Sequence, residues 1–132
     1  EKLAAYFSLE LIAEDYDEGE FLSAVGGLEG EREGGARCPV CFKLRLDKTA
    51  ERAKKEGLKA FCSTLTVSPH KNATIINAIG EEIAAARNIA WIPSDFKKRD
   101  GYLRSCRMCR EMDIYRQNYC GCRFSLTSEA TE

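Results

Sequence analysis

This sequence of 132 residues contains seven cysteines, and their side chains and spacing suit them for metal binding or redox reactions. Six of them stand in three close pairs, namely Cys38 with Cys41, Cys106 with Cys109, and Cys120 with Cys122. The total is odd and the sequence carries no sign of secretion, so a disulfide framework is not expected. In a reducing compartment, closely spaced cysteines are typically metal ligands or redox groups.

The first pair, Cys38 and Cys41, lies where a glycine-rich stretch gives way to helix-forming residues. Their three-residue spacing places both sulfurs on one helix face. A helix N-terminus also favours the thiolate, which is the form that binds metal or acts as a nucleophile. By itself the pattern fits both a thioredoxin-like redox pair and half of a metal site.

The last pair, Cys120 and Cys122, is separated by a glycine that lets the backbone turn tightly, so that both sulfurs can face one centre. With Cys38 and Cys41, it would supply the four thiolates of an iron-sulfur cluster or a tetrahedral zinc site. The long interval between the two pairs is unlike a compact zinc ribbon. The spacing therefore favours a cluster or a catalytic metal over structural zinc.

The other three cysteines are predicted to be core residues. Cys106 and Cys109 share a helical stripe with Tyr102, and Cys62 lies within an apolar stretch typical of a buried strand.

His70 is the only histidine, which leaves little room for histidine-based catalysis or a two-histidine zinc finger. It precedes Lys71 and Asn72 at the start of a predicted helix, after a Ser-Pro turn, a setting suited to phosphate binding. A simple helix cap by Ser68 with exposed neighbours explains the same residues equally well.

The elements that must position these residues alternate as in an α/β protein. We predict strands at 9–13, 60–65 and 90–92, helices at about 15–22, 38–56, 73–86 and 102–112, and loops at 26–35 and 95–101. The helix at 38–56 should end at Gly57, and the helix at 73–86 carries an apolar stripe of Ile75, Ile76, Ile79, Ile83 and Ala86. The order indicates a Rossmann-like α/β layer architecture with a largely parallel sheet. One domain is expected over residues 1–126, followed by a polar tail at 127–132.

The net charge of −1 conceals a strong asymmetry along the chain. Residues 1–33 carry ten acids and two bases, whereas residues 34–126 carry nine acids and eighteen bases. The basic region suits a polyanionic partner, although a solvated lysine-rich helix face explains it as well. No apolar run approaches the roughly 20 residues of a membrane span, so we expect a soluble, cytoplasmic protein.

Four blocks of sequence, in this order, strongly resemble the QueH epoxyqueuosine reductases: residues 34–46, 64–72, 95–98 and 115–122. The resemblance covers nearly all the chain, and the first cysteine pair combined with the Tyr-Arg-Gln-Asn-Tyr-Cys-Gly-Cys block is its most specific part. It implies two-electron removal of the epoxide oxygen from epoxyqueuosine at the wobble position of tRNA. It also implies a [4Fe-4S] cluster, a nearby additional iron, and an electron donor that the sequence does not identify.

The resemblance also implies roles for individual residues. Cys38, Cys41, Cys120 and Cys122 would be metal ligands, and Asp95 would orient the epoxide or supply a proton. The anticodon arm would contact His70, Lys71, Asn72, Lys97, Lys98, Tyr115, Arg116 and Tyr119. Among these, Arg116 and the loop lysines would lie near phosphates, and Tyr115 or Tyr119 would stack on an unpaired base.

One feature of the family has no counterpart here, a first strand that ends in a Cys-Cys motif and contributes further ligands. We therefore expect this chain to be a fragment that lacks the first strand of its sheet, and we predict that its metal site is incomplete and that it is inactive by itself.

Two other functions use the same residues. A zinc-bound module could bind tRNA without redox chemistry through the same four cysteines and basic surface. A thioredoxin-like oxidoreductase could be built on Cys38 and Cys41, but it would leave Cys120 and Cys122 without a role.

Overall fold

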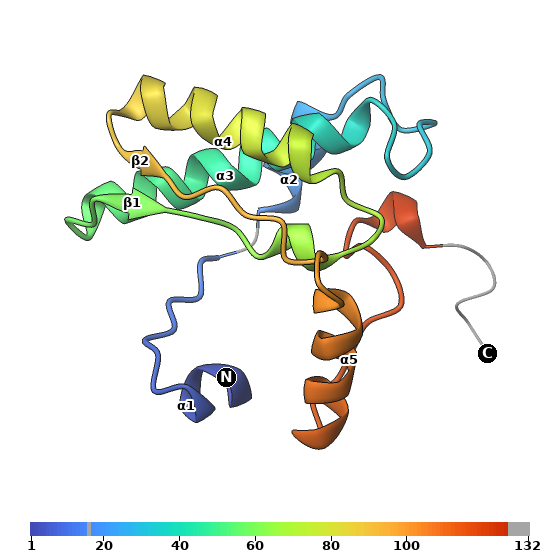
Figure 1. The fold of residues 1–132 in the computed structure, drawn as a ribbon. Helices are drawn as coiled ribbons and strands as arrows, with labels where there is room; N and C mark the ends of the chain where they lie inside the picture. Colours follow the sequence, from blue (N-terminus) through green and yellow to red (C-terminus); the bar gives the residue numbers. More distant parts are fainter. Residues whose placement is uncertain (16, 127–132) are drawn as a thin grey trace.

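The computed structural model describes residues 1–15 and 17–126, so the predicted tail at 127–132 lies outside the described residues. The elements follow in the order α1 (Lys2–Tyr6), α2 (Glu18–Ala24), α3 (Arg37–Lys55), β1 (Ala60–Phe61), η1 (Leu65–Val67), α4 (Ala73–Arg87), β2 (Ala90–Trp91), α5 (Gly101–Glu111) and η2 (Arg123–Ser125). Figure 1 shows α3 and α4 side by side as one layer, with the small sheet against them and α5 projecting away.

The predicted helix over 38–56 is confirmed as α3, and its end has a clear local cause. Gly57 adopts φ 72°, and the chain closes through Gly57 N–H to Lys54 O at 3.0 Å and Leu58 N–H to Ala53 O at 2.8 Å. These are the paired bonds by which a left-handed glycine ends a helix. The predicted helix around 15–22 is likewise confirmed as α2, where the Asp17 side chain accepts from Glu20 N–H.

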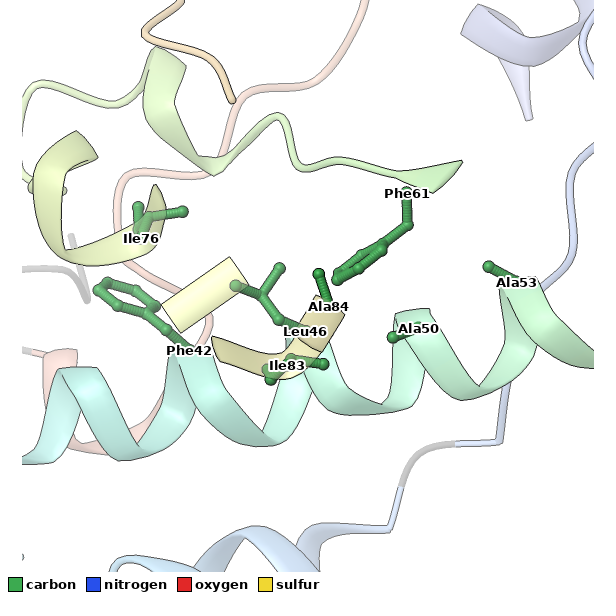
Figure 2. Close-up of a cluster of buried hydrophobic side chains, with 8 residues drawn as sticks. All are labelled: Phe42, Leu46, Ala50, Ala53, Phe61, Ile76, Ile83 and Ala84. Atoms are coloured by element: carbon green, nitrogen blue, oxygen red, sulfur yellow. The ribbon is translucent and has the colours of Figure 1, made fainter. Parts of the chain in front are cut away.

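The core lies between α3, α4 and the sheet, and the predicted isoleucine stripe on α4 supplies much of it (Figure 2). Ile76 and Ile83 are 0% and 3% exposed and pack with Phe42 and Leu46 of α3. Burying each large apolar side chain contributes roughly 1.5–3 kcal/mol. The packed pair of α3 and α4 therefore supports the loops that connect the elements.

The sheet is parallel, as predicted, and its two strands are joined through α4. Ala60 pairs with Ala90 and Phe61 with Trp91. The α/β fold is thus confirmed, but the strand expected over 60–65 is only two residues long. Ser63 Oγ accepts from Leu65 N–H at 3.1 Å, and such local bonds compete with a strand ladder and turn the chain into η1.

The strand predicted at 9–13 is wrong, because no strand of the described residues pairs with it. Leu9 and Leu11 are 63% and 56% exposed. An extended segment becomes a strand only when a neighbour satisfies its backbone donors and acceptors, and apolar composition alone does not supply that neighbour.

The prediction that Cys62 is a core residue is also wrong, since its side chain is exposed. Successive strand residues face opposite sides of a sheet. Phe61 is buried at 5% exposure against the helices, so Cys62 faces the opposite side.

Gly80 on α4 lies directly against Trp91 of β2. A Cβ at this position would lie 2.4 Å from both Cδ2 and Cε2 of Trp91. We expect Gly80→Ala to lower the free energy of unfolding by about 1–3 kcal/mol through overpacking, despite the better helix propensity of alanine. Urea unfolding followed by circular dichroism measures this. Gly30→Ala is the matched control because a Cβ there meets nothing within 4 Å, and equal stability of the two variants would contradict the prediction.

No helix among the described residues is both long enough and apolar enough to cross a membrane.

Candidate functional site

The four cysteines predicted as metal ligands line one small cavity. The cavity lies between the start of α3 and the segment that enters η2, and its lining is Phe21, Glu33, Arg37, Cys38, Cys41, Phe42, Cys120, Cys122 and Ser125. The fold therefore brings together two cysteine pairs that are about 80 residues apart in the sequence.

The first pair is placed by the beginning of α3. Cys38 Sγ accepts a hydrogen bond from Gly34 N–H at 3.2 Å, and Gly34 adopts φ 83°, which a glycine does at little cost. Cys41 follows one turn later. Burial raises the pKa of its thiol, Arg45 opposes the shift, and the sulfurs of the other three cysteines add to it. At Cys41, burial therefore works against the thiolate that the helix N-terminus was expected to favour.

The second pair is placed by a turn that Ser125 closes. Cys120 N–H donates to Ser125 Oγ at 3.1 Å, and Ser125 Oγ–H donates to Cys122 O at 2.7 Å. Gly121 between the cysteines adopts φ 93°. This conformation confirms the tight turn expected from a glycine at this position.

Arg37 joins the two halves of the cavity, and sequence reasoning missed it. Only 2% of its surface is exposed. Its guanidinium donates to the carbonyl oxygens of Leu28, Glu29 and Glu31 in the glycine-rich loop. It also lies 4.9 Å from the ring centre of Phe124, which follows the second cysteine pair. One side chain thus links the loop before Cys38 to the segment after Cys122.

The donor set of this cavity fits an iron-sulfur cluster or a zinc ion in type and number, since both accept four thiolates. Within residues 1–15 and 17–126, however, no three His, Cys, Asp or Glu side chains are arranged so that they could hold a metal ion. The structure supports the grouping of the four cysteines and leaves their role as ligands a prediction.

A second, larger cavity of about 450 Å³ lies between η1 and the segment after α5. Four residues predicted to contact tRNA line it, and they are His70, Lys71, Arg116 and Tyr119. Cys120 lines this cavity as well as the smaller one. Lys71 Nζ donates to Cys120 Sγ at 3.3 Å, so a cation of the larger cavity contacts a sulfur of the cysteine cavity.

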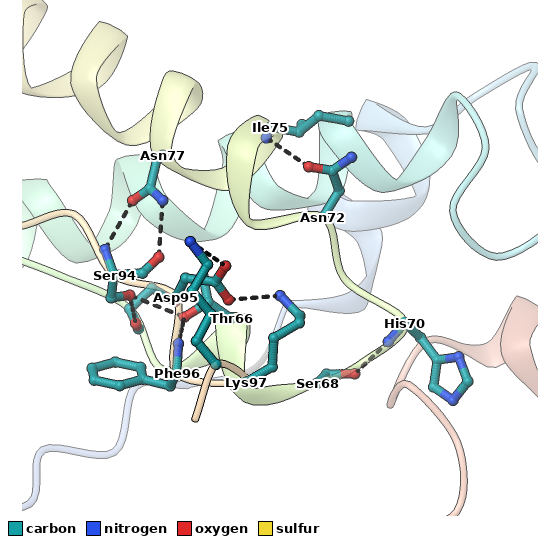
Figure 3. Close-up of polar contacts among 12 residues, drawn as sticks. Thr66, Ser68, His70, Asn72, Ile75, Asn77, Ser94, Asp95, Phe96 and Lys97 are labelled. Atoms are coloured by element: carbon teal, nitrogen blue, oxygen red, sulfur yellow. Dashed lines mark hydrogen bonds and ion pairs between the residues drawn. The ribbon is translucent and has the colours of Figure 1, made fainter. Parts of the chain in front are cut away.

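The other predicted site residues lie elsewhere. Tyr115 is 83% exposed and lines neither cavity. The Asn72 side-chain oxygen caps α4 by accepting from Ile75 N–H at 3.2 Å. The Ser68 hydroxyl oxygen accepts from His70 N–H at 3.3 Å, before α4 begins. The interpretation of Ser68 as the helix cap is therefore wrong, because Asn72 caps α4 (Figure 3).

Asp95, Lys97 and Lys98 also lie outside both cavities. The Asp95 carboxylate pairs with Lys97 Nζ at 3.2 Å and lies 3.9 Å from Lys98 Nζ. Thr66 holds this segment through Phe96 N–H to Thr66 Oγ1 and Lys97 N–H to Thr66 O, each at 3.2 Å (Figure 3). The structure therefore groups these three residues with each other and not with the cysteines.

Comparison with known proteins gives a consistent result. The family model described as "Epoxyqueuosine reductase QueH" matches residues 1–128. The chain is 49% identical over 118 residues to the epoxyqueuosine reductase QueH of Streptococcus pyogenes, covering 89% of this chain and 46% of that protein. It is 40% identical over 127 residues to the epoxyqueuosine reductase QueH of Staphylococcus epidermidis, covering 95% of this chain and 53% of that protein. It is 37% identical over 129 residues to the epoxyqueuosine reductase QueH of Thermotoga maritima, covering 96% of this chain and 67% of that protein. The chain thus spans about half the length of the first two relatives.

Proposed function

The chain belongs to the epoxyqueuosine reductase QueH family, and from this premise we propose that the protein reduces epoxyqueuosine in tRNA to queuosine in the cytoplasm. The reaction removes the epoxide oxygen as water and consumes two electrons and two protons. The observation that carries the proposal is the shared wall of the two cavities. Cys120 belongs to both, so a substrate in the larger cavity would lie beside the cysteines.

Cys38, Cys41, Cys120 and Cys122 are the residues proposed to hold a [4Fe-4S] cluster, with an additional iron nearby. Such a cluster would supply electrons one at a time, and a Lewis-acidic iron held nearby would polarise the epoxide oxygen. A cluster distributes its thiolates over several iron atoms, so the four sulfurs need not converge on one point as they would around a single ion. Gly34 N–H and Lys71 Nζ, which donate to Cys38 and Cys120 respectively, would stabilise negative charge on these sulfurs.

The larger cavity is proposed to take the modified nucleotide of the anticodon arm. Lys71 and Arg116 supply positive charge for phosphate, and Tyr119 supplies a ring for stacking on an unpaired base. The exposed Tyr115, together with His70, Lys97 and Lys98, would extend the contact to the surrounding backbone. Asp95 would have to leave Lys97 to reach the cavity, so we assign it no step in the reaction.

The decisive experiment uses the whole protein reconstituted anaerobically with iron and sulfide. It is incubated with tRNA carrying epoxyqueuosine and a chemical reductant, and the nucleosides are analysed by mass spectrometry. We expect a product lighter by one oxygen atom and iron with sulfide in the protein. Stoichiometric zinc, no sulfide and unchanged epoxyqueuosine would instead support the tRNA-binding zinc module.

The thioredoxin-like alternative is less well supported by the geometry. Cys38 and Cys41 do begin a helix, but they share their cavity with Cys120 and Cys122. A thiol exchange enzyme needs only the first pair.

Lys71→Met is expected to weaken binding of an anticodon stem-loop. The slope of the logarithm of the association constant against the logarithm of the salt concentration should become shallower by about 0.9, which is the value for one lost phosphate contact on a duplex. The α4 cap is formed by Asn72 and does not involve the Lys71 side chain, so the fold should persist. Titrations at several salt concentrations measure the slope. Lys59→Met removes an exposed lysine that lines neither site cavity. If both variants lower the slope equally, Lys71 makes no specific contact.

A further inference from the structure

Cys106 and Cys109 form a third thiol pair that the proposed function does not use. They lie on α5, a helix without a single buried residue, and both cysteines are partly exposed. Neither lines either site cavity. The prediction that this pair packs in the core is therefore wrong, because the face of α5 that carries it is covered by Arg116 and not by the body of the protein.

Arg116 lies along this face of α5. Its Nη1 is 3.6 Å from Cys109 Sγ and 3.4 Å from Ser105 Oγ, and its guanidinium carbon is 5.5 Å from the ring centre of Tyr102. Its pKa is raised, chiefly by the hydrogen bond with Cys109. Arg116 also lines the larger cavity. The thiol pair thus helps to hold a cation that forms part of that cavity's wall.

A soft metal ion is a poor occupant for this pair. A guanidinium already lies beside the sulfurs, and a second cation would be repelled by it. The described residues also place no third ligand with the two cysteines. Reversible oxidation fits better, because a disulfide carries no charge and needs no further ligand.

The helix geometry allows a disulfide at some cost. Residues three apart on a helix have Cβ atoms about 5–6 Å apart, whereas a disulfide needs about 3.5–4.5 Å. Cys109 lies in the last turn of α5, which ends where Asp113 adopts φ 50°. Helix ends fray more readily than helix interiors, so this end of α5 can yield. The strain would make the disulfide easy to reduce.

We propose that Cys106 and Cys109 are a reversible dithiol–disulfide pair whose oxidation removes the contact between Arg116 and Cys109. The oxidant is a small-molecule disulfide such as oxidised glutathione. Its sulfur–sulfur bond breaks, one forms between Cys106 and Cys109, and the two thiol protons leave with two reduced glutathiones. The thiol contact of Arg116 is lost in the product. Arg116 lines the cavity proposed for tRNA, so any effect of the oxidation on tRNA binding rests on the proposed function, whereas the disulfide itself does not.

The test uses the intact protein, equilibrated anaerobically with oxidised glutathione, alkylated and digested with trypsin. Cleavage follows Arg104, Arg107 and Arg110, so the disulfide would join the peptides 105–107 and 108–110. We expect this linked pair in the oxidised sample and its loss after dithiothreitol. Separate alkylated peptides, or one glutathione on each cysteine, would overturn the proposal.

Two variants and one further readout complete the test. In Cys106→Ser, Cys109 should carry a glutathione, whereas Cys62→Ser should leave the linked peptides unchanged. Modification of Arg116 by phenylglyoxal should be about fivefold faster in the oxidised protein, as expected for the loss of one ordinary hydrogen bond. An unchanged rate would refute the loss of the contact between Arg116 and Cys109. Neither readout requires tRNA or reductase activity, so a failure here is distinct from a failure of the proposed function.

Discussion

Arg37→Met is expected to lower the free energy of unfolding by about 3 kcal/mol or more, because hydrogen bonds to a charged donor contribute roughly 1.5–3 kcal/mol each. The guanidinium donates to three carbonyl oxygens of one loop and is 2% exposed. Methionine fills much of the same volume and donates nothing, so the loop carbonyls lose their partner. Urea unfolding followed by the fluorescence of the single tryptophan, Trp91, measures the loss.

Two controls separate this role from a general effect of charge. Arg32→Met removes an exposed arginine from the same loop and should change stability little. Arg37→Lys keeps the charge but loses the forked set of guanidinium donors. Its free energy of unfolding should lie between those of the wild type and Arg37→Met. If Arg37→Met unfolds at the same urea concentration as Arg32→Met, Arg37 does not organise the loop.

Cys120→Ser is expected to lower the metal content strongly, reducing bound iron and sulfide by roughly tenfold or more. The estimate is conservative, since losing even an outer-shell partner of a metal ligand costs about 10- to 100-fold in affinity. Cys120 is the cysteine that lines both cavities and receives the Lys71 hydrogen bond. Iron and sulfide analysis after anaerobic reconstitution, with the absorbance spectrum, gives the measurement.

The matched control is Cys62→Ser, which removes an exposed cysteine outside both cavities. It should retain the iron and sulfide of the wild type. Serine at Cys38, Cys41 or Cys122 should instead resemble Cys120→Ser, because all four thiols share one cavity. Equal iron content in Cys62→Ser and Cys120→Ser would rule out the proposed ligand set.

Helix ends, buried helix faces and close cysteine pairs depend on residues near one another in the chain, so they could be predicted before the fold was known. Gly57 predicted where α3 ends, because the left-handed conformation it adopts is a property of glycine. The isoleucine spacing predicted α4 and its buried face, since a helix repeats every 3.6 residues. The close spacing of Cys38 with Cys41 and of Cys120 with Cys122 likewise identified the pairs, while the blocks around them identified the family.

Contacts between residues far apart in the sequence became known only from the three-dimensional fold. The convergence of the two cysteine pairs depends on how the segment after α5 returns to α3, and Arg37, with its loop carbonyls and Phe124, fixes that return. The apolar residues 9–13 predicted a strand that has no partner, and Cys62 faces outward because Phe61 faces the helices. The segment that carries Asp95 is likewise held by a distant residue, since Phe96 N–H donates to Thr66 Oγ1. Such contacts arise from packing between separate elements, and local periodicity carries no information about them.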